Sequence, residues 1–499
     1  MTAAAAPTDE PDDQVSRVNV PLGLILLAGA VTALAGFWQH DVSDEIRGNA
    51  LAVTCVGVAG GLFITRRTGL MAGMAAGHVG PWASLSFALV FGLGSLQWTA
   101  PQLNGFAAVI APENVAKALE LLTFAWGAWV LGYLTDVLKF AQRPATWLVD
   151  LAMRPESAGY RWRTSGVWWL LALGLVGQAL RVRTNTFGYV TDVSASLTSF
   201  SSLGQIVSVL SNMGLFAVVL AAVKYFSPER RGRLAPLVVV STVQVLLALA
   251  QGLKEGVAVV AVAIILSYGL VRGRVPVRMI VVASLLFAFA VLPVVTSYRV
   301  TVRGGGAVPS VGEAIALLPD VAANALGSRT ASQNSEQLAS RLRVVDSLAV
   351  VIQKSPDVVP YAPLSDLVVQ PVVGLVPRAL WPGKPGFTGG YDFGRIYYNA
   401  PSNFYSAWAA TPPADLYRRG GTAILILGML LLGGLYRLFD TVLRPQTDIR
   451  HLFLIVALFP VLVKHEIDVG SLLLTLPVSL IGVAIAVRAL GLVGEHEQG

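Results

Sequence analysis

Residues 277–296 read VRMIVVASLLFAFAVLPVVT and hold a single charged side chain, Arg278, close to one end. A run of about 20 apolar residues has the length of a helix that crosses a hydrocarbon core of roughly 30 Å. Similar runs recur along the chain between short polar breaks. The stretch therefore predicts a membrane-spanning helix, and its repetition predicts an all-α, polytopic integral membrane protein.

The composition of the whole chain supports this fold class. Of its 499 residues, 55% are hydrophobic and 13% are charged, whereas soluble domains carry roughly a quarter charged residues. A soluble globular protein is thereby excluded. We expect about twelve transmembrane helices, over residues 20–38, 48–65, 82–99, 116–138, 164–180, 205–225, 234–252, 256–271, 277–296, 420–438, 451–463 and 469–487.

Cysteine and histidine usage argues against metal chemistry. The only cysteine, Cys55, lies inside the second apolar run, so no internal disulfide and no site with several thiolates can form. The five histidines are scattered without the spacing of metal ligands. We therefore predict no metal and no cofactor. The net charge of +7 is spread over many loops, and it predicts membrane orientation instead of a nucleic-acid partner.

The distribution of basic residues predicts the topology. Cytoplasmic loops retain Lys and Arg, and one side of the predicted bundle holds most of them. The short segments on the other side hold only Arg47, Lys117, Arg181, Arg183, Lys254 and Lys464. Both termini should then face the cytoplasm from the cell inner membrane. Residues 1–19 are acidic, lack the features of a signal peptide and predict a disordered tail, and residues 491–499 predict a second one.

The longest segment without a span, residues 297–419, separates nine helices in residues 20–296 from three in residues 420–490. It should form one large extracytoplasmic loop between helices 9 and 10. Within it, residues 335–354 place Leu342, Val345 and Leu348 on one face at helical spacing. We expect an amphipathic helix that lies on the membrane or packs over the bundle, while the Pro- and Gly-rich residues 371–390 predict irregular backbone.

A stiff, basic stretch near the end of this loop could bind phosphate. Residues 376–392 read VPRALWPGKPGFTGGYD, in which Arg378 and Lys384 flank Trp381 and its neighbouring prolines. An Arg fork matches phosphate oxygens bidentately and a Lys acts as a point charge. The pair could hold a diphosphate, or both side chains could anchor the loop on lipid headgroups.

This stretch also carries a family resemblance. The run VPRALWPGKP, followed by Gly389 and Tyr391 and then by TPPADLYRRGG directly before a span, resembles the O-antigen polymerase (oligosaccharide repeat-unit polymerase) family. Family members commonly show a Pro-Arg and Trp-Pro-x-Lys-Pro run late in a large external loop, then a Tyr and a Phe-Gly pair. Tyr417 is similar to that Tyr, but Arg419 stands where the aromatic residue is expected.

Three shorter external stretches are also similar to family positions. They are RVRTNTFGYV at residues 181–190, QGLKEG at residues 251–256 and SYRVTVRG at residues 297–304. The resemblance implies a GT-C-like membrane glycosyltransferase that uses oligosaccharides linked to polyprenyl diphosphate. A hydroxyl of one lipid-linked repeat would attack the anomeric carbon of another and release lipid diphosphate. Its implied partners are that substrate, membrane lipids, a flippase and a chain-length regulator.

Such a reaction needs fixed cations at the outer surface for the leaving diphosphate. The basic candidates on that side are Arg181, Arg183, Lys254, Arg299, Arg303, Arg378 and Lys384, and the aromatic ones are Trp381, Tyr391 and Tyr417. Arg299 and Arg303 directly follow the ninth helix. They could meet an emerging diphosphate or simply snorkel at a helix end.

The reaction also needs a base that accepts the proton of the attacking hydroxyl. The external candidates are Asp392, Asp415, His465 and Glu466. The last two belong to KHEID, residues 464–468, which joins two apolar helices. This turn could be a site or a solvated hairpin in which Lys464 and Glu466 neutralise each other. Glu255 beside Lys254 predicts a local ion pair.

Two other functions fit the same topology. A ligase similar to O-antigen ligases would deliver the lipid-linked glycan to a different acceptor. A polysaccharide or lipid transporter would show broken helices and polar groups that converge near the middle of the membrane. The predicted helices carry little beyond Ser, Thr and Gln in their centres, which favours the enzyme.

Overall fold

The computed structural model describes residues 22–24, 26–34, 41–66, 69–99, 109–153, 165–188, 204–227, 233–304, 310–328, 343–376, 380–381, 383, 389–401, 408, 410–446, 448 and 450–491. This described part is helical throughout and contains no strand. Nine of its helices are long and apolar enough to cross a membrane. The predicted all-α membrane architecture is therefore confirmed.

The predicted spans correspond to observed helices, but not all of them reach the length of a span. The nine long ones are α2 (Val42–Ile64), α4 with η1 and η2 (Val79–Thr99), α5 (Pro112–Thr135), α7 (Ser165–Arg183), α9 (Gly204–Phe226), α11 (Lys254–Arg272), α12 with η6 and α13 (Val277–Gly304), α20 (Gly421–Val442) and α22 (Val469–Gly491). Shorter apolar helices cover Leu22–Leu34, α10 (Leu234–Ala250) and α21 (Arg450–Val463).

Helices α2, α4 with η1 and η2, α5 and α20 pack together as a first group. The backbones of α5 and α20 touch because glycines face each other: a Cβ on Gly132 would collide with the Leu430 carbonyl, and one on Gly433 with the Trp129 carbonyl. Small residues at helix contacts are typical of membrane bundles, where close approach increases van der Waals packing.

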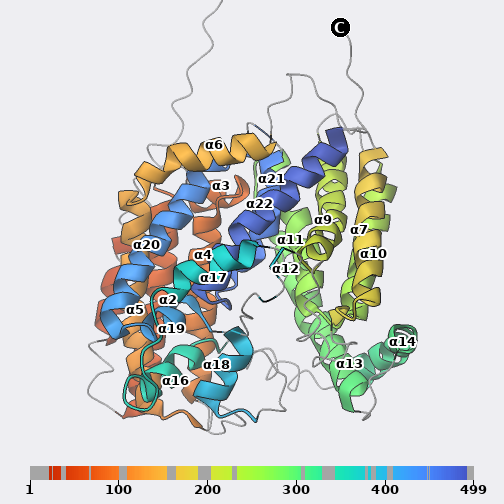
Figure 1. The fold of residues 1–499 in the computed structure, drawn as a ribbon. Helices are drawn as coiled ribbons and strands as arrows, with labels where there is room; N and C mark the ends of the chain where they lie inside the picture. Colours follow the sequence, from red (N-terminus) through yellow and green to blue (C-terminus); the bar gives the residue numbers. More distant parts are fainter. Residues whose placement is uncertain are drawn as a thin grey trace, which may run out of the picture.

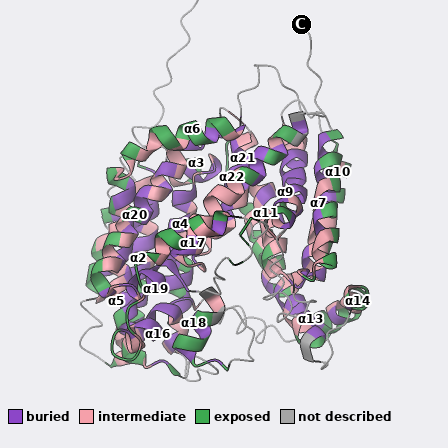
Figure 2. Ribbon diagram, viewed as in Figure 1, coloured by how far each residue is buried: buried purple, intermediate pink, exposed green. Residues whose placement is uncertain are grey.

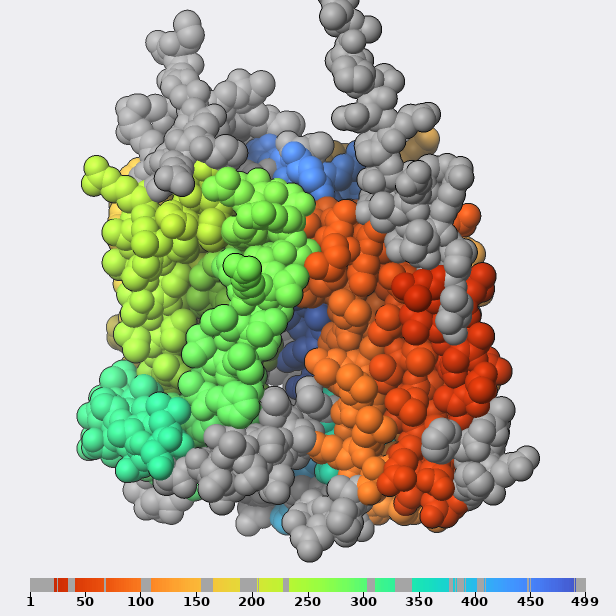
Figure 3. Space-filling model, turned by 180° about the vertical axis from the view of Figure 1, so that it is seen from behind, coloured from red at the N-terminus to blue at the C-terminus, as the bar shows by residue number. Residues whose placement is uncertain are grey.

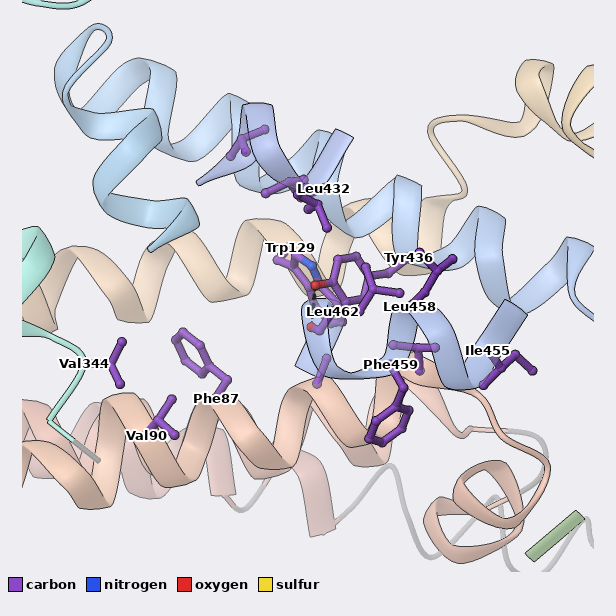
Figure 4. Packing of buried hydrophobic residues seen from close by; sticks show 14 of the residues in the cluster. Phe87, Val90, Trp129, Val344, Leu432, Tyr436, Ile455, Leu458, Phe459 and Leu462 are labelled. Carbon is purple, nitrogen blue, oxygen red and sulfur yellow. Dashed lines mark hydrogen bonds between the residues drawn. The ribbon is translucent and has the colours of Figure 1, made fainter. Parts of the chain in front are cut away.

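Stacked aromatic rings fill the centre of this first group. Phe87 stacks on Trp126 at 3.9 Å between ring centroids, and Trp126 stacks on Trp129 at 4.2 Å. Tyr436 from α20 meets Trp129 edge-on, and its hydroxyl donates to the Leu462 carbonyl of α21 at 2.6 Å. Figure 4 shows Trp129, Tyr436 and Leu462 clustered there. These contacts fix α21 against the first group.

A second group consists of α7, α9, α10, α11 and the continuous α12–η6–α13 helix. Its tightest contact joins α7 to α9, where Gly174 lies against the backbone of Gly214. On α12, large apolar side chains such as Val282 and Leu286 are exposed, as expected of a surface that faces lipid. Helices α21 and α22 lie between the two groups, where α21 contacts both groups and α22 packs on α21 and on the second group.

The two ends of the molecule differ. Helix α6 (Gln142–Met153) lies across one end, which we call the α6 end (Figure 1). Helices α14 (Val311–Ser328), α16 (Asp346–Lys354) and α18 (Gly389–Tyr398) lie at the opposite end, which we call the α16 end. Figure 2 shows that buried residues concentrate inside the groups, while α6 is largely exposed. Within the described part of residues 297–419, α14, α16 and α18 thus lie at one end of the bundle, whereas α17 lies along α22.

The amphipathic helix predicted for residues 335–354 is shorter where it is described. Helix α16 begins at Asp346, and residues 335–342 lie outside the described residues. Asp346 accepts hydrogen bonds from Trp98 Nε1 and Arg343 Nε, both at 2.8 Å, which ties the start of α16 to η2. Burial raises the pKa of the Asp346 carboxyl, and the two hydrogen-bond donors partly offset this rise. The donors therefore stabilise the charged carboxylate in its buried position. The helix packs over the bundle against α5.

The Pro- and Gly-rich stretch is less irregular than predicted. Helix α17 (Asp366–Leu375) contains Pro371, and α18 begins at Gly389. The proline is accommodated because α17 packs along α22, where Gly374 lies against Leu474 and the side chain of Gln370 donates to Ser471 Oγ at 3.1 Å. Tertiary packing thus overrides the local preference of proline.

Candidate functional site

The surface is hollowed between the two groups. Figure 3 shows this hollow between the green helices α11 to α13 and the orange part of the first group, with blue chain of α21 and α22 visible at its depth. A band of polar side chains runs from α7 to α19 at the level of the turn between α21 and α22. We call it the polar band.

The polar band begins where α7 meets the end of α10. Arg181 Nη1 donates to Gln251 Oε1 at 3.4 Å, and Gln251 Nε2 donates to Gln178 Oε1 at 2.9 Å. Both glutamines are buried. Buried amides are stable only when they are hydrogen-bonded, so this chain of bonds holds Arg181 at the junction of the two helices.

Helix α13 joins the same junction. Arg299 Nε donates to the Gly252 carbonyl at 2.8 Å, and the buried Tyr298 hydroxyl donates to the Ala250 carbonyl at 2.9 Å. These carbonyls end α10, where a helix leaves its last acceptors without partners inside the helix. The cation and the phenol satisfy them. Three stretches that the sequence singled out separately, around residues 181, 251 and 299, therefore meet here.

The turn between α21 and α22 connects this junction to the first group. Lys464 Nζ lies 2.9 Å from Glu255 Oε2 at the start of α11, and both side chains are partly exposed. The expected pairing of Lys464 with Glu466 is thus wrong, because the turn lies beside α11 and does not project alone into solvent. Lys254, the first residue of α11, is half-buried.

His465 lies in the core, although the sequence predicted an external base there. Its Nε2 lies 3.0 Å from the Ala83 carbonyl, and its ring packs edge-on against Trp126 and Phe87. Burial lowers the pKa of His465 to about 4, so the ring is neutral at neutral pH. It lines a small pocket of about 10 Å³, which holds about one water molecule.

Asp415 is also placed in the interior. It lies on α19 (Pro412–Tyr417) and is fully buried. Its Oδ1 pairs with Arg418 at 2.6 Å and with Arg419 at 3.2 Å, while Oδ2 accepts from the Val469 amide at 2.9 Å. Both oxygens therefore hold structure together, since the carboxylate caps the start of α22. Asp415 is therefore not exposed to solvent.

Glu466 is the carboxylate of the turn that stays available. It is half-buried, and it forms no hydrogen bond or ion pair with the residues that the structure describes. Its neighbour Asp468 is occupied, because its Oδ1 accepts from the Ser471 amide at 2.8 Å in the first turn of α22. Asp392, the remaining candidate base, is exposed on α18 at the α16 end.

Arg418 and Arg419 link the band to α17. Arg419 is buried and pairs with Asp366 at 3.7 Å. Arg418 is partly exposed while it holds Asp415. The sequence named Gln251, Arg418 and Arg419 only as parts of the quoted stretches and gave them no role in a site, and it did not single out Gln178. A signal existed for the glutamines, since each is a polar residue inside or at the end of an otherwise apolar run.

Three other predicted residues have described side chains. Arg183 is exposed in the last turn of α7, Trp381 is exposed, and Tyr417 is buried on α19. Arg303 lies in the last turn of α13 and Tyr391 in α18, but their side chains lie outside the described residues. The same holds for Arg378 and Lys384 altogether.

The polar band has the chemistry of an anion site. Guanidinium groups of Arg181 and Arg299 and the ammonium of Lys464 lie on elements that meet at one level, and the turn that carries Lys464 also carries Glu466. Fixed cations stabilise negative charge on a ligand, and a nearby carboxylate can accept a proton. The described residues contain no group of three or more potential metal ligands.

Fold and site together define a polytopic helical membrane protein with a polar site between two helix groups. The chain belongs to the family described as a domain of unknown function, DUF8712, whose model matches residues 178–441, just over half of the sequence. The match begins at Gln178 and includes the helices that carry Arg181, Arg299 and Asp415. Comparisons with curated proteins and with solved structures found no match.

Proposed function

We propose that this protein is a glycosyltransferase that polymerises oligosaccharide repeats linked to polyprenyl diphosphate. The reaction would occur at the outer face of the cytoplasmic membrane, with both termini in the cytoplasm. One observation carries the proposal: the stretches around residues 181, 251, 299 and 464, far apart in the sequence, form the polar band beside the hollow.

The cations of the band suit a leaving diphosphate. As the bond between the anomeric carbon and the phosphate oxygen breaks, its electron pair moves onto the diphosphate. Arg181 and Arg299 are held by Gln251 and by the Gly252 carbonyl, so they need little reorganisation when that charge develops. A charge-assisted hydrogen bond is worth about 1.5–3 kcal/mol. Lys254 and Lys464 add positive charge at the same level.

Glu466 is the best candidate for the base. The hydroxyl oxygen of the acceptor sugar forms the new bond to the anomeric carbon, and Glu466 takes the proton of that hydroxyl. Asp415 and His465 suit this role poorly, because Asp415 is occupied by arginines and a backbone amide and His465 is enclosed by aromatic rings. Arg378 and Lys384 retain the role predicted from the sequence, which is to bind the diphosphate of the lipid.

A reconstituted reaction tests the function. The purified protein in lipid nanodiscs receives a lipid-linked repeat unit, and the products are separated by size. We expect a ladder of products. We expect Arg299→Ala to reduce the rate by about tenfold to a hundredfold, since it loses roughly 1.5–3 kcal/mol of stabilisation. Glu466→Gln removes the proposed base and should reduce the rate by about 10²- to 10⁴-fold.

Matched variants make the result specific. Arg278→Ala removes an exposed arginine at the other end of the same continuous helix, and Glu313→Gln removes an exposed carboxylate on α14. Both should keep the ladder of the native protein. A native ladder from Arg299→Ala and Glu466→Gln would contradict the assignment of the site, and no product at all from the native protein would contradict the function.

The short helices favour transport as a second candidate function. Helices α17 and α21 have 10 and 14 residues and each contains a proline, whereas a span needs about 20. Broken helices around a polar site are typical of transporters. The same nanodisc sample yields no ladder in that case, while vesicles show movement of the lipid-linked sugar. Addition of a single block to another acceptor would indicate the ligase.

A further inference from the structure

Helix α6 is an element that none of the predicted spans includes. It follows η4 (Lys139–Ala141) directly and lies across the α6 end of the bundle (Figure 1). Its 12 residues reach about 18 Å, too short to cross a bilayer. It packs on α20 and α22.

The circumference of α6 has three different sides. Val149 and Met153 are buried against the bundle. A second side is apolar and exposed, with Phe140 at 79%, Trp147 at 63%, Leu148 at 46% and Leu151 at 48%. The third side is polar and exposed, and it carries Arg143, Thr146 and Asp150. A helix that touched only protein and water would not need the second side.

The exposed apolar side continues a surface that already faces lipid. Helix α5 exposes Leu131 and Leu134 in its last turn, and the chain passes from there through η4 into α6. Contiguous apolar area costs about 25 cal/mol per Å² in water, and patches of this kind mark contacts with a partner or a membrane. The continuity with a spanning helix identifies the membrane as the partner.

We propose that α6 is an interfacial helix that inserts its apolar side into the lipid leaflet at the α6 end. Phe140, Trp147, Leu148 and Leu151 contact acyl chains, and Trp147 lies at the level of the headgroups. Lys139 and Arg143 are exposed cations beside this side, so they contact acidic phospholipid headgroups. Such a helix fixes the depth of α20 and α22, on which it packs.

Site-directed spin labelling tests the insertion. In a Cys55→Ala background, which removes the only cysteine, Leu148→Cys and Thr146→Cys each carry one nitroxide label. The protein is reconstituted into vesicles of phosphatidylglycerol and phosphatidylcholine. We expect the label at position 148 to be reached by oxygen and protected from a water-soluble nickel complex. The label at position 146 should show the opposite preference.

Two outcomes would overturn the proposal. Equal access of the nickel complex to both labels would place the apolar side in water. Dipolar broadening between labels at position 148 would show that a second copy of the chain covers this side. The readout involves no glycosyl transfer, so its result is independent of the proposed function.

Charge variants test the headgroup contact without altering the apolar side. Lys139→Gln with Arg143→Gln should abolish the thermal stabilisation that phosphatidylglycerol gives over phosphatidylcholine. Asp150→Asn, on the same polar side, should retain it. If the double variant kept the full lipid preference, the acidic-lipid contact would be wrong even though the helix could still insert.

Discussion

The most apolar helix of the molecule is also among the least buried. An 18-residue window in the span Val277–Val302 has a mean hydropathy of 2.6 and is 28% buried, whereas the corresponding window in Val79–Thr99 has a mean hydropathy of 1.5 and is 67% buried. In a water-soluble protein the more apolar helix would be the more deeply buried one. In a membrane, lipid tails are as apolar as Leu, so hydropathy does not drive a helix inward.

The residues of the first group are buried because its helices fit closely together. Glycines bring α5 and α20 into backbone contact, and stacked rings fill the space beside them. The second group has exposed Val and Leu side chains along α12 and fewer buried positions. We infer that the first group tolerates added volume poorly, while the lipid-facing helices tolerate it well.

The largest effect should come from filling the closest contact. Gly132→Ala places a methyl group against the Leu430 carbonyl, and a backbone atom cannot rotate away as a side chain can. Overpacking typically costs about 1–3 kcal/mol, and we expect the upper end, about 3 kcal/mol, or loss of the folded protein. Thermal unfolding in detergent measures it.

The control for this variant lies on the same helix. A Cβ on Gly127 meets nothing within 4 Å, so Gly127→Ala should be neutral or should stabilise α5 by up to about 1 kcal/mol through helix propensity. If the two variants unfold at the same temperature, close backbone packing does not distinguish the first group.

Acid should act through His465, which belongs to the core of the first group. Its pKa falls from 6.5 to about 4 on burial. The stability is therefore complete above pH 6.5 and is lost as the pH falls toward 4, because the unfolded chain binds a proton that the folded chain excludes. Over this window the loss is about 3 kcal/mol.

A substitution isolates this pH dependence. His465→Phe keeps an aromatic ring among Phe87, Phe91 and Trp126 and should flatten the stability between pH 6.5 and 4. His78→Gln, a half-buried histidine at the start of α4, should leave the slope as it is. An unchanged slope in His465→Phe would show that the imidazole is not the group that titrates.

Much of the fold could be predicted from the sequence, because a membrane-spanning helix is apolar whether it faces lipid or other helices. Helix α6 escaped prediction for a physical reason: Arg143, Pro144, Thr146 and Asp150 interrupt its apolar residues, and an interfacial helix needs only one apolar side. Helix α17 escaped as well, since it depends on packing against α22, whereas the observed bounds of α21 agree with the predicted helix over residues 451–463.

The sequence predicted the positions of the cations Arg181 and Arg299, but it did not predict where the candidate proton acceptors lie. Arg181 and Arg299 stand at helix ends, where a cation meets carbonyls, so their position follows from the boundaries of the apolar runs. The density of charge in residues 464–468 indicated a special turn but not its direction. Only the fold shows that His465 points into the aromatic core while Lys464 reaches Glu255.

The smallest effect on stability should come from the ion pair that joins the turn between α21 and α22 to the start of α11. Lys464 and Glu255 are 34% and 49% exposed at 2.9 Å, and partly exposed pairs contribute at most about 1 kcal/mol, screened by salt. Glu255→Gln should therefore lower the free energy of unfolding by less than about 1 kcal/mol, and added salt should reduce the difference.

A double-mutant cycle separates this pair from its surroundings. Glu255→Gln, Lys464→Gln and the combined variant give the coupling energy, and Glu313→Gln serves as the control because Glu313 is exposed and accepts hydrogen bonds from Ser310 in the same turn of the chain. A coupling well above about 1 kcal/mol would mean that the turn is desolvated between the groups. The hollow would then be closed at the level of the turn. The second group would be held to the first as firmly as the helices of the first group are held to one another.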